Sequence, residues 1–561
     1  MIFKYLLNKP WGAIASGQRR IEQKQLKRSE GFDYFHQRCR SMDNERREYI
    51  LAMGYEELRQ GLQNNSLTPT EVHQAYGWKI LEVNDKINCV AEMITESFTM
   101  AAEVERLYHN KPNKPAFYGI PVSVKGNFFM PGYDCTIGFS KFIGMPKDSQ
   151  CSLISTLIEL GAIPICLTNV PQALLSYACS NPVYGTTENP LAHGMTPGGS
   201  SGGEAALVAA GGIPFGTGSD VAGSLRIPAV MCGIVSMKPS EARLLITNSH
   251  GGFPGKCRLG LSFGFFTHNV GELINIFDLY LNSEEHLKCS PRSIPMPFDM
   301  SKVHKKEKLR IGYFSDIGFL PPVPAAKRAL RHAVKMLEVD GHEVIQFDIP
   351  HPQLMAELVL KNILPDGGVY MKELFSGDIV DDYMKQFLLL LKIPDSIRKI
   401  ASYAIQYVCP QLATMCRIGM NNIPQLRYMQ EQTDDYAREW YEQWNNLNLD
   451  AMICPSFPVT QLPHSYPSKL GACAVYTGLF NMLDCPAGIV PVDKITDQDI
   501  KDLNNDNIFP VGLNPILKDM RSGCSKDEGL PVSVQVVTLP FREELCLHVM
   551  QIVEALAAKH H

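Results

Sequence analysis

The sequence predicts an α/β fold built as one large domain, and three observations support this. Between residues 119 and 240, short runs of β-forming residues alternate with helical stretches and glycine-rich turns, an alternation typical of α/β proteins. The same alternation of β-type and helical segments returns over residues 309–349. This repetition along the chain favours one interwoven domain over separate ones. Of the 561 residues, 45% are hydrophobic and 20% charged, as in a globular protein.

The chain begins with a basic segment. Residues 1–50 carry 11 Lys and Arg against 6 Asp and Glu, although the whole chain has a net charge of −5. We expect a helical arm here, and two interpretations stay open. It is either a solvated helix or a contact with an anionic membrane surface, where each basic residue gains about 1 kcal/mol. Residues 51–561 are expected to form the main domain.

The next elements follow from periodicity. Apolar residues recur at helical spacing over residues 54–84, and Thr68 precedes a proline as a helix cap would. Apolar runs with β-branched residues predict strands, and a longer periodic stretch predicts a helix. The strands are placed at residues 120–124, 162–166, 309–313 and 343–347, and the helix at residues 324–338.

Residues 385–430 allow two interpretations. One helical face gathers Ile397, Ile400, Ala401, Ala404, Ile405 and Val408, and Pro410 interrupts the helix. The segment is either an ordinary amphipathic helix packed on the core or an apolar patch that lies on a membrane. In the second case, flanking cations would meet anionic headgroups: Arg398, Lys399, Arg417 and Arg427.

Composition excludes several classes of function. The pI of about 6.3 does not favour a nucleic-acid binder. None of the 16 cysteines is spaced from another cysteine or from a histidine as zinc-finger ligands are. We therefore expect no metal site and no cofactor. That many thiols, without a secretory signal in the N-terminal residues, indicate a reduced, intracellular protein. No apolar run is long enough to span a bilayer.

Three segments are candidates for chemistry. They are Pro197-Gly-Gly-Ser-Ser-Gly-Gly-Glu-Ala-Ala206, Gly216-Thr-Gly-Ser-Asp-Val-Ala-Gly-Ser-Leu-Arg-Ile-Pro228 and Gly119-Ile-Pro-Val-Ser-Val-Lys-Gly126. The first lacks the lysine of a phosphate-binding loop, and the second lacks the nucleophile elbow of the α/β-hydrolases. A lone serine in such a loop is usually structural. Together, however, the three segments resemble the amidase signature family, whose serine- and glycine-rich stretch matches residues 198–239.

The resemblance implies a fold with a large twisted mixed β-sheet surrounded by helices, and a Ser-Ser-Lys triad. Ser224 would be the nucleophile, Ser200 the bridging serine and Lys125 the base. A hydroxyl both donates and accepts, and a buried lysine has a lowered pKa, so a relay through Ser200 is chemically reasonable. The family's bridging serine is held by an unusual cis peptide bond, so we expect backbone strain at Ser200–Ser201.

The resemblance also implies how the loop is built. Backbone N–H groups of Val221, Ala222, Gly223 and Ser224 would form the oxyanion hole, each worth roughly 3–4 kcal/mol of barrier. Asp220 and Arg226 are expected to form a buried ion pair that supports the loop.

Within the family, the chain most resembles the fatty acid amide hydrolases from about residue 50 onward. Cys179-Ser-Asn-Pro182 and Glu543-Glu-Leu-Cys-Leu547 carry this likeness most narrowly. Residues 393–430 occupy the position of that group's membrane cap, and Leu174 and Tyr177 would contact substrate unless they are ordinary core. Wider family segments also match at Glu82–Cys89, Thr168–Gln172, Leu483–Gly488 and Gly529–Gln535.

Two departures from the family pattern bear on activity. Ala222 stands where the family usually has glycine, so its methyl group would crowd the oxyanion hole or resist a positive φ. Gly264-Phe-Phe-Thr-His-Asn269 replaces a different family segment. The basic arm also stands in place of an N-terminal transmembrane helix.

We therefore expect a serine hydrolase that cleaves long-chain fatty acid amides, such as N-acylethanolamines and primary fatty amides, through an acyl-enzyme. The alternatives are an amidase of another substrate class, an amidotransferase subunit, and a lipid-amide-binding protein with weak turnover. The expected partners are a lipid amide and, peripherally, a membrane surface, with no nucleic acid; a homodimer is also anticipated. The protein is expected in the cytoplasm or on the cytoplasmic face of endomembranes.

Overall fold

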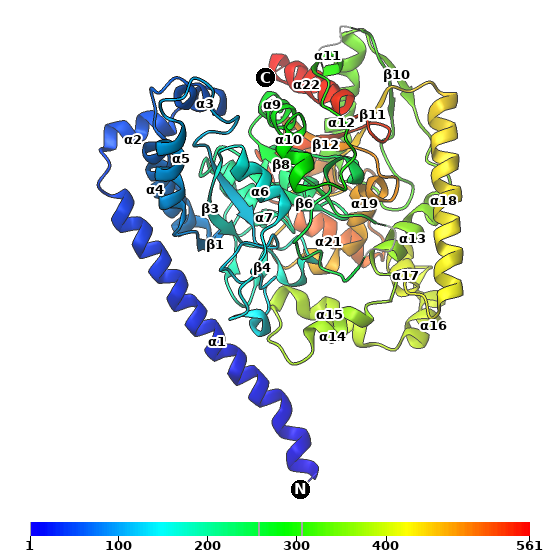
Figure 1. The fold of residues 1–561 in the computed structure, drawn as a ribbon. Coiled ribbons are helices and arrows are strands. Elements are labelled where there is room, and N and C mark those ends of the chain that lie inside the picture. The colour runs from blue at the N-terminus through cyan, green and yellow to red at the C-terminus, as the bar shows by residue number, and fades with distance from the viewer. Residues whose placement is uncertain (1, 256–258, 304–306, 561) are drawn as a thin grey trace.

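A mixed β-sheet runs through the protein, with helices on both sides (Figure 1). The computed structural model describes residues 2–255, 259–303 and 307–560. The strands are β1 (Val90–Met93), β2 (Pro121–Lys125), β3 (Ile163–Thr168), β4 (Ser180–Asn181), β5 (Gly185–Thr186), β6 (Gly216–Asp220), β7 (Val235–Lys238), β8 (Ser262–Thr267), β9 (Arg310–Tyr313), β10 (Glu343–Gln346), β11 (Ala451–Pro455), β12 (Ala487–Lys494) and β13 (Pro531–Val537).

The helices of the first half of the chain surround the N-terminal strands and the glycine-rich loops. They are α1 (Ile2–Cys39), α2 (Asn44–Leu51), α3 (Tyr55–Gln63), α4 (Pro69–Ile87), α5 (Ser97–Tyr108), α6 (Ser152–Glu159), α7 (Gly202–Ala209), α8 (Arg226–Cys232), α9 (Val270–Leu281) and α10 (Glu284–Cys289), with short 3₁₀ turns η1 (Ser140–Phe142), η2 (Gln172–Leu174) and η3 (Glu241–Leu244).

The second half contributes most of the remaining helices, including a group at one edge of the body. They are α11 (Met300–Val303), α12 (Pro324–Val339), α13 (Pro352–Ile363), α14 (Val369–Phe375), α15 (Lys385–Lys392), α16 (Asp395–Ile405), α17 (Pro410–Cys416), α18 (Ile423–Asn446), α19 (Val475–Met482), α20 (Asp497–Leu503), α21 (Pro515–Gly523) and α22 (Glu543–His560), with 3₁₀ turns η4 (Asp382–Met384), η5 (Pro467–Lys469) and η6 (Gly471–Ala474).

Within the described residues, eight strands form the main sheet in the order β10-β9-β11-β13-β12-β7-β8-β6. The β10–β9 and β9–β11 pairs are parallel, and the other pairs are antiparallel. A second sheet has the order β1-β3-β2. The predicted α/β fold with a large mixed sheet and surrounding helices is therefore confirmed.

The main sheet is apolar on both faces, as a sheet covered by helices on both sides must be. Along β11, Met452 packs in one core cluster with residues of α8 and α19, while Ile453 packs in another with residues of α12 and α22. This alternation follows from the two-residue period of a strand. It places the two clusters on opposite faces of the sheet.

Thr217 contributes to the contact between the two sheets. Thr217 on the edge strand β6 accepts a hydrogen bond from the Lys125 backbone N–H at 3.2 Å and donates to the Ser123 carbonyl at 3.1 Å. The side chain thus replaces part of the backbone pairing that β2 would otherwise make with β6. The end of β2 is held against β6 by this contact, next to the glycine-rich loops.

The predicted helices and strands lie close to their expected places. Thr68 caps α4 and forms a capping box with Glu71. The strands predicted around residues 120, 162, 309 and 343 are β2, β3, β9 and β10, and the predicted helix at residues 324–338 is α12. Residues 264–267 of the unusual segment lie in buried strand β8, and Asn269 at its end caps α9, so these residues contribute to the fold.

The basic N-terminal segment forms the long helix α1, which projects from the body toward its N-terminal end (Figure 1). Farther along this helix, Lys24 is buried between Glu92 and Asp134, each at 2.8 Å from its Nζ. Arg28 donates to Asn88 and to the Val90 carbonyl. Part of the positive charge of residues 1–50 is therefore used to attach the helix to the main domain.

Near residues 385–430 the expected helix is divided. Helix α16 ends at Ile405 and α17 begins at Pro410, where the sequence predicted an interruption. Among the described residues, no helix has both the length and the apolar character needed to cross a membrane.

Candidate active site

A largely apolar cavity of about 170 Å³ opens beside the two glycine-rich loops. Ser200 and Ser224 line it, together with Ser219, Val221 and Ala222. Its remaining walls are mainly aliphatic and come from α13, α15 and α17 and from the loop that follows β3. Two serine hydroxyls therefore meet a space suited to an apolar ligand.

Lys125 lies at the end of β2 and is fully buried. Its Nζ donates to Ser200 Oγ at 3.0 Å and to Ser219 Oγ at 2.9 Å, with a longer contact to the Ser219 carbonyl at 3.4 Å. The backbone bond to Thr217 fixes the strand from which this side chain extends. The amine is thus held within reach of the hydroxyl of Ser200.

Burial lowers the pKa of Lys125 to about 7, although the negative charges of Asp220 and Glu204 oppose the shift. A charged amine is disfavoured away from water, whereas the neutral form is not. Near neutral pH, a substantial fraction of this lysine is consequently unprotonated and able to accept a proton.

Glu204 is a buried carboxyl group close to this lysine. Burial raises the pKa of Glu204 to about 7, against hydrogen bonds that Ser123 and Thr168 donate to it. It also accepts the Thr217 backbone N–H at 3.0 Å. By binding residues of β2, β3 and β6, Glu204 holds together the strands that position Lys125.

Ser200 is buried at the N-terminal side of α7, and the peptide bond before it, Gly199–Ser200, is cis. The cis bond thus lies one residue before the Ser200–Ser201 bond, at which strain was expected. Ser224 is partly exposed to the cavity. Among the described residues, no hydrogen bond joins Ser200 to Ser224; catalytic hydrogen bonds often form only once substrate is bound.

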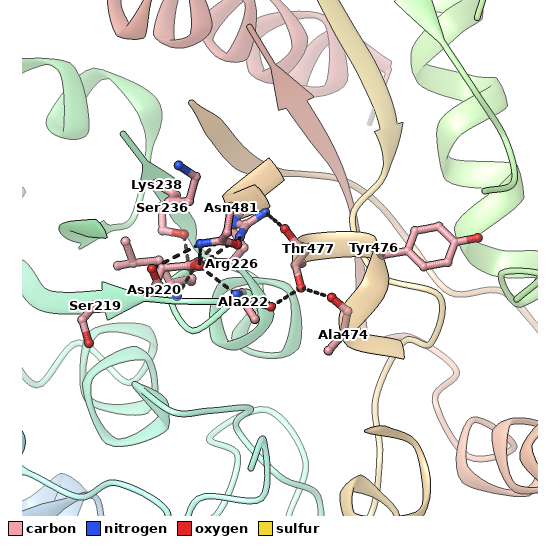
Figure 2. A network of polar contacts seen from close by, with 12 residues as sticks. Ser219, Asp220, Ala222, Arg226, Ser236, Lys238, Ala474, Tyr476, Thr477 and Asn481 are labelled. Carbon is pink, nitrogen blue, oxygen red and sulfur yellow. Dashed lines mark hydrogen bonds and ion pairs between the residues drawn. The ribbon is translucent and has the colours of Figure 1, made fainter. Parts of the chain in front are cut away.

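Asp220 and Arg226 form an ion pair that is fully buried (Figure 2). Arg226 Nη2 donates to Asp220 Oδ1 at 2.9 Å, and Nε donates to Oδ2 at 3.1 Å. Burial alone would raise the pKa of Asp220, but the charge and hydrogen bonds of Arg226, with Asn481, outweigh it and lower this pKa to about 2. Asp220 is therefore ionised near neutral pH.

The same carboxylate shapes the turn that carries Ser224. Asp220 accepts the backbone N–H of Gly223 at 2.7 Å and that of Leu225 at 3.0 Å. The Gly223 N–H is thereby engaged, which conflicts with its expected place in the oxyanion hole. Val221, Ala222 and Ser224 stay as the proposed donors.

Helix α19 supports the turn from the other side (Figure 2). Thr477 Oγ1 donates to the Ala222 carbonyl at 2.5 Å, and Asn481 Nδ2 donates to Asp220 Oδ1 at 2.9 Å. Arg226 completes the link by donating to the Thr477 carbonyl at 2.8 Å and to Gln535 at 2.9 Å. The loop is therefore held in one shape before any substrate arrives, as electrostatic stabilisation of an oxyanion requires.

The backbone at Ala222 carries no strain of the expected kind. In the described chain its φ is not positive, whereas Gly223 has a φ of +127°. A side chain at Gly223 would also clash with Thr477. The positive φ, which only glycine adopts readily, is thus at Gly223. Alanine at position 222 is compatible with the turn.

Leu174 and Tyr177 both line the cavity. Tyr177 is also tied to the body, because its hydroxyl donates to the Leu470 carbonyl at 2.6 Å. The position of the two side chains is compatible with contact with an apolar ligand.

Sequence reasoning did not identify Ser219, Glu204, Thr477 or Asn481. Ser219 precedes Asp220 on β6. Its position beside β2 could have been predicted only if β6 had been recognised as a strand that lies next to β2. Thr477 and Asn481 are four residues apart in an otherwise apolar helix, which puts them on one face. Among the described residues, no group of three or more His, Cys, Asp or Glu side chains is placed to hold a metal ion.

Replacement of Asp220 by Asn should destabilise the protein strongly, because it leaves the buried Arg226 without its counter-charge. The expected loss is roughly 3–5 kcal/mol, seen as a lower midpoint in a thermal melt. Asp435→Asn is the matched control, since Asp435 pairs with Arg438 at the surface and exposed pairs contribute little. Equal melting temperatures for the two variants would contradict the supporting role of the buried pair.

Comparison with known proteins relates this geometry to a family. A family model described as Amidase matches residues 71–547. Fatty-acid amide hydrolase 1 of Sus scrofa is 34% identical over 91% of this chain and 87% of its own length. Fatty acid amide hydrolase 1 of Caenorhabditis elegans is also 34% identical, over 91% of this chain and 90% of its own length.

Solved structures show the same fold. A fatty acid amide hydrolase structure superposes with a TM-score of 0.76 at 22% identity and covers 96% of this chain and 90% of its own. A 6-aminohexanoate cyclic dimer hydrolase structure gives a TM-score of 0.66 at 19% identity, over 90% of this chain and 97% of its own. The family model spans both serine loops and the lysine strand, and the chain belongs to the amidase family.

Proposed function

We propose that this amidase hydrolyses amides of long-chain fatty acids, with Ser224 as nucleophile, Ser200 as bridging serine and Lys125 as base. The observation that carries the proposal is the cavity, which presents Ser224 and Ser200 to an apolar space, with the hydroxyl of Ser200 bound to the buried Lys125. Relatives that are 34% identical over most of the chain are named fatty acid amide hydrolases. N-acylethanolamines and primary fatty amides are the proposed substrates.

The proposed reaction proceeds through an acyl-enzyme. Neutral Lys125 takes the proton of Ser200, which takes that of Ser224 as its Oγ attacks the amide carbon. Backbone N–H groups of the turn stabilise the resulting oxyanion. The proton then returns through Ser200 to the nitrogen of the leaving amine as the C–N bond breaks. Water attacks the ester in a second cycle and releases the fatty acid.

Ser224→Ala should abolish hydrolysis and leave the fold intact, because a methyl group cannot attack a carbonyl. Purified wild type and variant are compared on amides from acetamide to long-chain N-acylethanolamines, with a thermal melt as the folding control. Wild type should favour long chains, and a fluorophosphonate should label wild type but not the variant. Variant activity within tenfold of wild type would refute the nucleophile. Substrate binding without turnover by wild type would favour a lipid-amide-binding protein instead.

The rate should fall as the pH drops below the pKa of Lys125, about 7. Only the neutral amine accepts a proton, so kcat/KM should decrease roughly tenfold per pH unit on the acidic side. The profile is measured from pH 5 to 9 with a soluble amide, while circular dichroism checks folding at each pH. Fluorophosphonate labelling should follow the same curve. A flat profile with the fold intact would contradict the role of Lys125.

Helix α16 supports a further proposal, that this edge of the protein rests on a membrane surface. The helix exposes its apolar face: Ile400 is 71% exposed and Tyr407, just beyond its end, 85%. Its buried positions are instead Arg398 and Ser402. This is the reverse of a helix packed on a protein core, where the apolar face points inward.

Neighbouring elements extend the apolar surface. Leu389 on α15 and Ile423 and Tyr428 on α18 are exposed as well, and α14–α17 gather at one edge of the body (Figure 1). Helices α15 and α17 also contribute lining residues to the cavity. A lipid amide entering from a membrane below these helices would have a short apolar path to Ser224.

Of the four cations expected to meet headgroups, Arg398 is not available. It is 3% exposed and turned inward, so the sequence-based assignment to lipid was wrong for this residue. Lys399, Arg417 and Arg427 stay as the proposed headgroup contacts. Binding would be peripheral, on the cytoplasmic face of an intracellular membrane. The expected homodimer stays a prediction, which sedimentation analysis of the purified protein tests.

Changing both Ile400 and Tyr407 to Asp should reduce binding to anionic liposomes by roughly tenfold or more, because two apolar contacts with lipid are lost. Flotation measures binding, and a thermal melt should show an unchanged fold. Leu513 and Ile508 are exposed hydrophobics outside this edge, and their double change to Asp is the matched control. A melt lowered only by the α16 changes, or equal flotation of both variants, would contradict the membrane surface.

A further inference from the structure

The cavity that leads to Ser224 contains a cation that the proposed reaction does not use. Arg398 on α16 lines this cavity and is 3% exposed, among mainly aliphatic neighbours. Its Nε is buried without a hydrogen-bond partner. The other contacts of the guanidinium are long: Nη2 donates to the Gly367 carbonyl at 3.4 Å and to Asp395 at 3.3 Å.

The charge of Arg398 is incompletely balanced by the contacts it makes. Asp395, its carboxylate partner, is partly exposed and pairs more closely with Lys399, at 2.7 Å. One carboxylate is thus shared between two cations. A buried charge with incomplete pairing is costly, and a buried polar group without a partner calls for an explanation, such as a ligand that binds there.

An apolar path connects Arg398 with the catalytic turn. Ile363 Cδ1 and Ala222 Cβ both lie 3.7 Å from the position that a Cβ of Gly478 would take. Four residues after Ile363, Gly367 meets the guanidinium, and four residues span at most about 14 Å. Leu364, Phe387, Leu391 and Met415 line the same cavity as Arg398 and Ala222.

We infer that Arg398 forms an anion subsite, which binds a carboxylate at the far end of an aliphatic chain whose amide lies at Ser224. A guanidinium matches a carboxylate in geometry and is the side chain best suited to bind it away from water. The inference rests on the proposed function and narrows its substrate class to amides of ω-carboxylated acyl chains. A fatty-acid product would present the same chemistry if it bound in the reverse direction.

The test compares primary amides of matched length that end in a carboxylate or a methyl group, over a series of about eight to about sixteen carbons. Wild type should prefer the ω-carboxy amide in kcat/KM by about tenfold or more at one optimal length, as a charge-assisted hydrogen bond allows. Arg398→Met should remove this preference. Lys385→Met, which removes an exposed cation paired with Asp382, should retain it.

Asp395→Asn should change the preference for the ω-carboxy amide in the opposite direction from Arg398→Met. It removes the carboxylate that competes for Arg398, so the preference for the ω-carboxy amide should increase. This variant and the wild-type length series also keep the inference testable if Arg398→Met does not fold. A preference that falls in Asp395→Asn, or is absent from wild type at every length, would overturn the substrate assignment.

A second arm distinguishes the source of the carboxylate. Inhibition by free fatty acids of the same lengths is measured for wild type and Arg398→Met, and calorimetry with Ser224→Ala measures binding of the ω-carboxy amides without turnover. Inhibition weakened by Arg398→Met, without a preference among amides, would assign the subsite to the product. No effect of Arg398 in either arm would refute the subsite. Failure to hydrolyse any amide would refute the proposed function alone, since the calorimetry still reports binding.

Discussion

The buried pair of Asp220 and Arg226 is the interaction on which the turn that carries Ser224 depends. The guanidinium meets the carboxylate, the carbonyl of Thr477 and the side chains of Asn481 and Gln535, so it joins β6, α8, α19 and β13. The carboxylate in turn holds two backbone N–H groups of the turn. Neither charge would be tolerated at this depth alone. Because each satisfies the other, the turn is fixed without help from a ligand.

A second balance of charge sets the pKa of Lys125. Burial disfavours a protonated Lys125, while Asp220 and Glu204 favour it, and the outcome is a pKa of about 7. Asp220 stays ionised because Arg226 stabilises it, so its influence on Lys125 is constant with pH. Thus the pair that shapes the turn also contributes to the proton affinity of the lysine. Structure and electrostatics are coupled here because the interior screens charges poorly.

Helix α16, at the edge formed by α14–α17, has the reverse of the usual arrangement of a helix packed on a protein core. It exposes isoleucine and tyrosine side chains and buries Arg398. A membrane on the outside and an anionic ligand on the inside would each account for one half of this inversion. The two proposals therefore concern opposite faces of one helix and can be tested separately.

The amino-acid sequence alone was sufficient for the fold class, for α4 and its cap, for β2, β3, β9, β10 and α12, and for the three segments that resemble the amidases. These features depend on local periodicity, on turn residues and on spacing, which are properties of neighbouring residues. Tertiary structure decided the rest. Only the packed chain could show that Ser219 and Glu204 surround Lys125, that Asn481 lies on Asp220, that Gly223 carries the positive φ, and that Arg398 points into the cavity. The physical reason is that a hydrophobic periodicity identifies an apolar face but not what that face meets, and that a pKa or an ion pair depends on residues hundreds of positions apart that folding brings into contact.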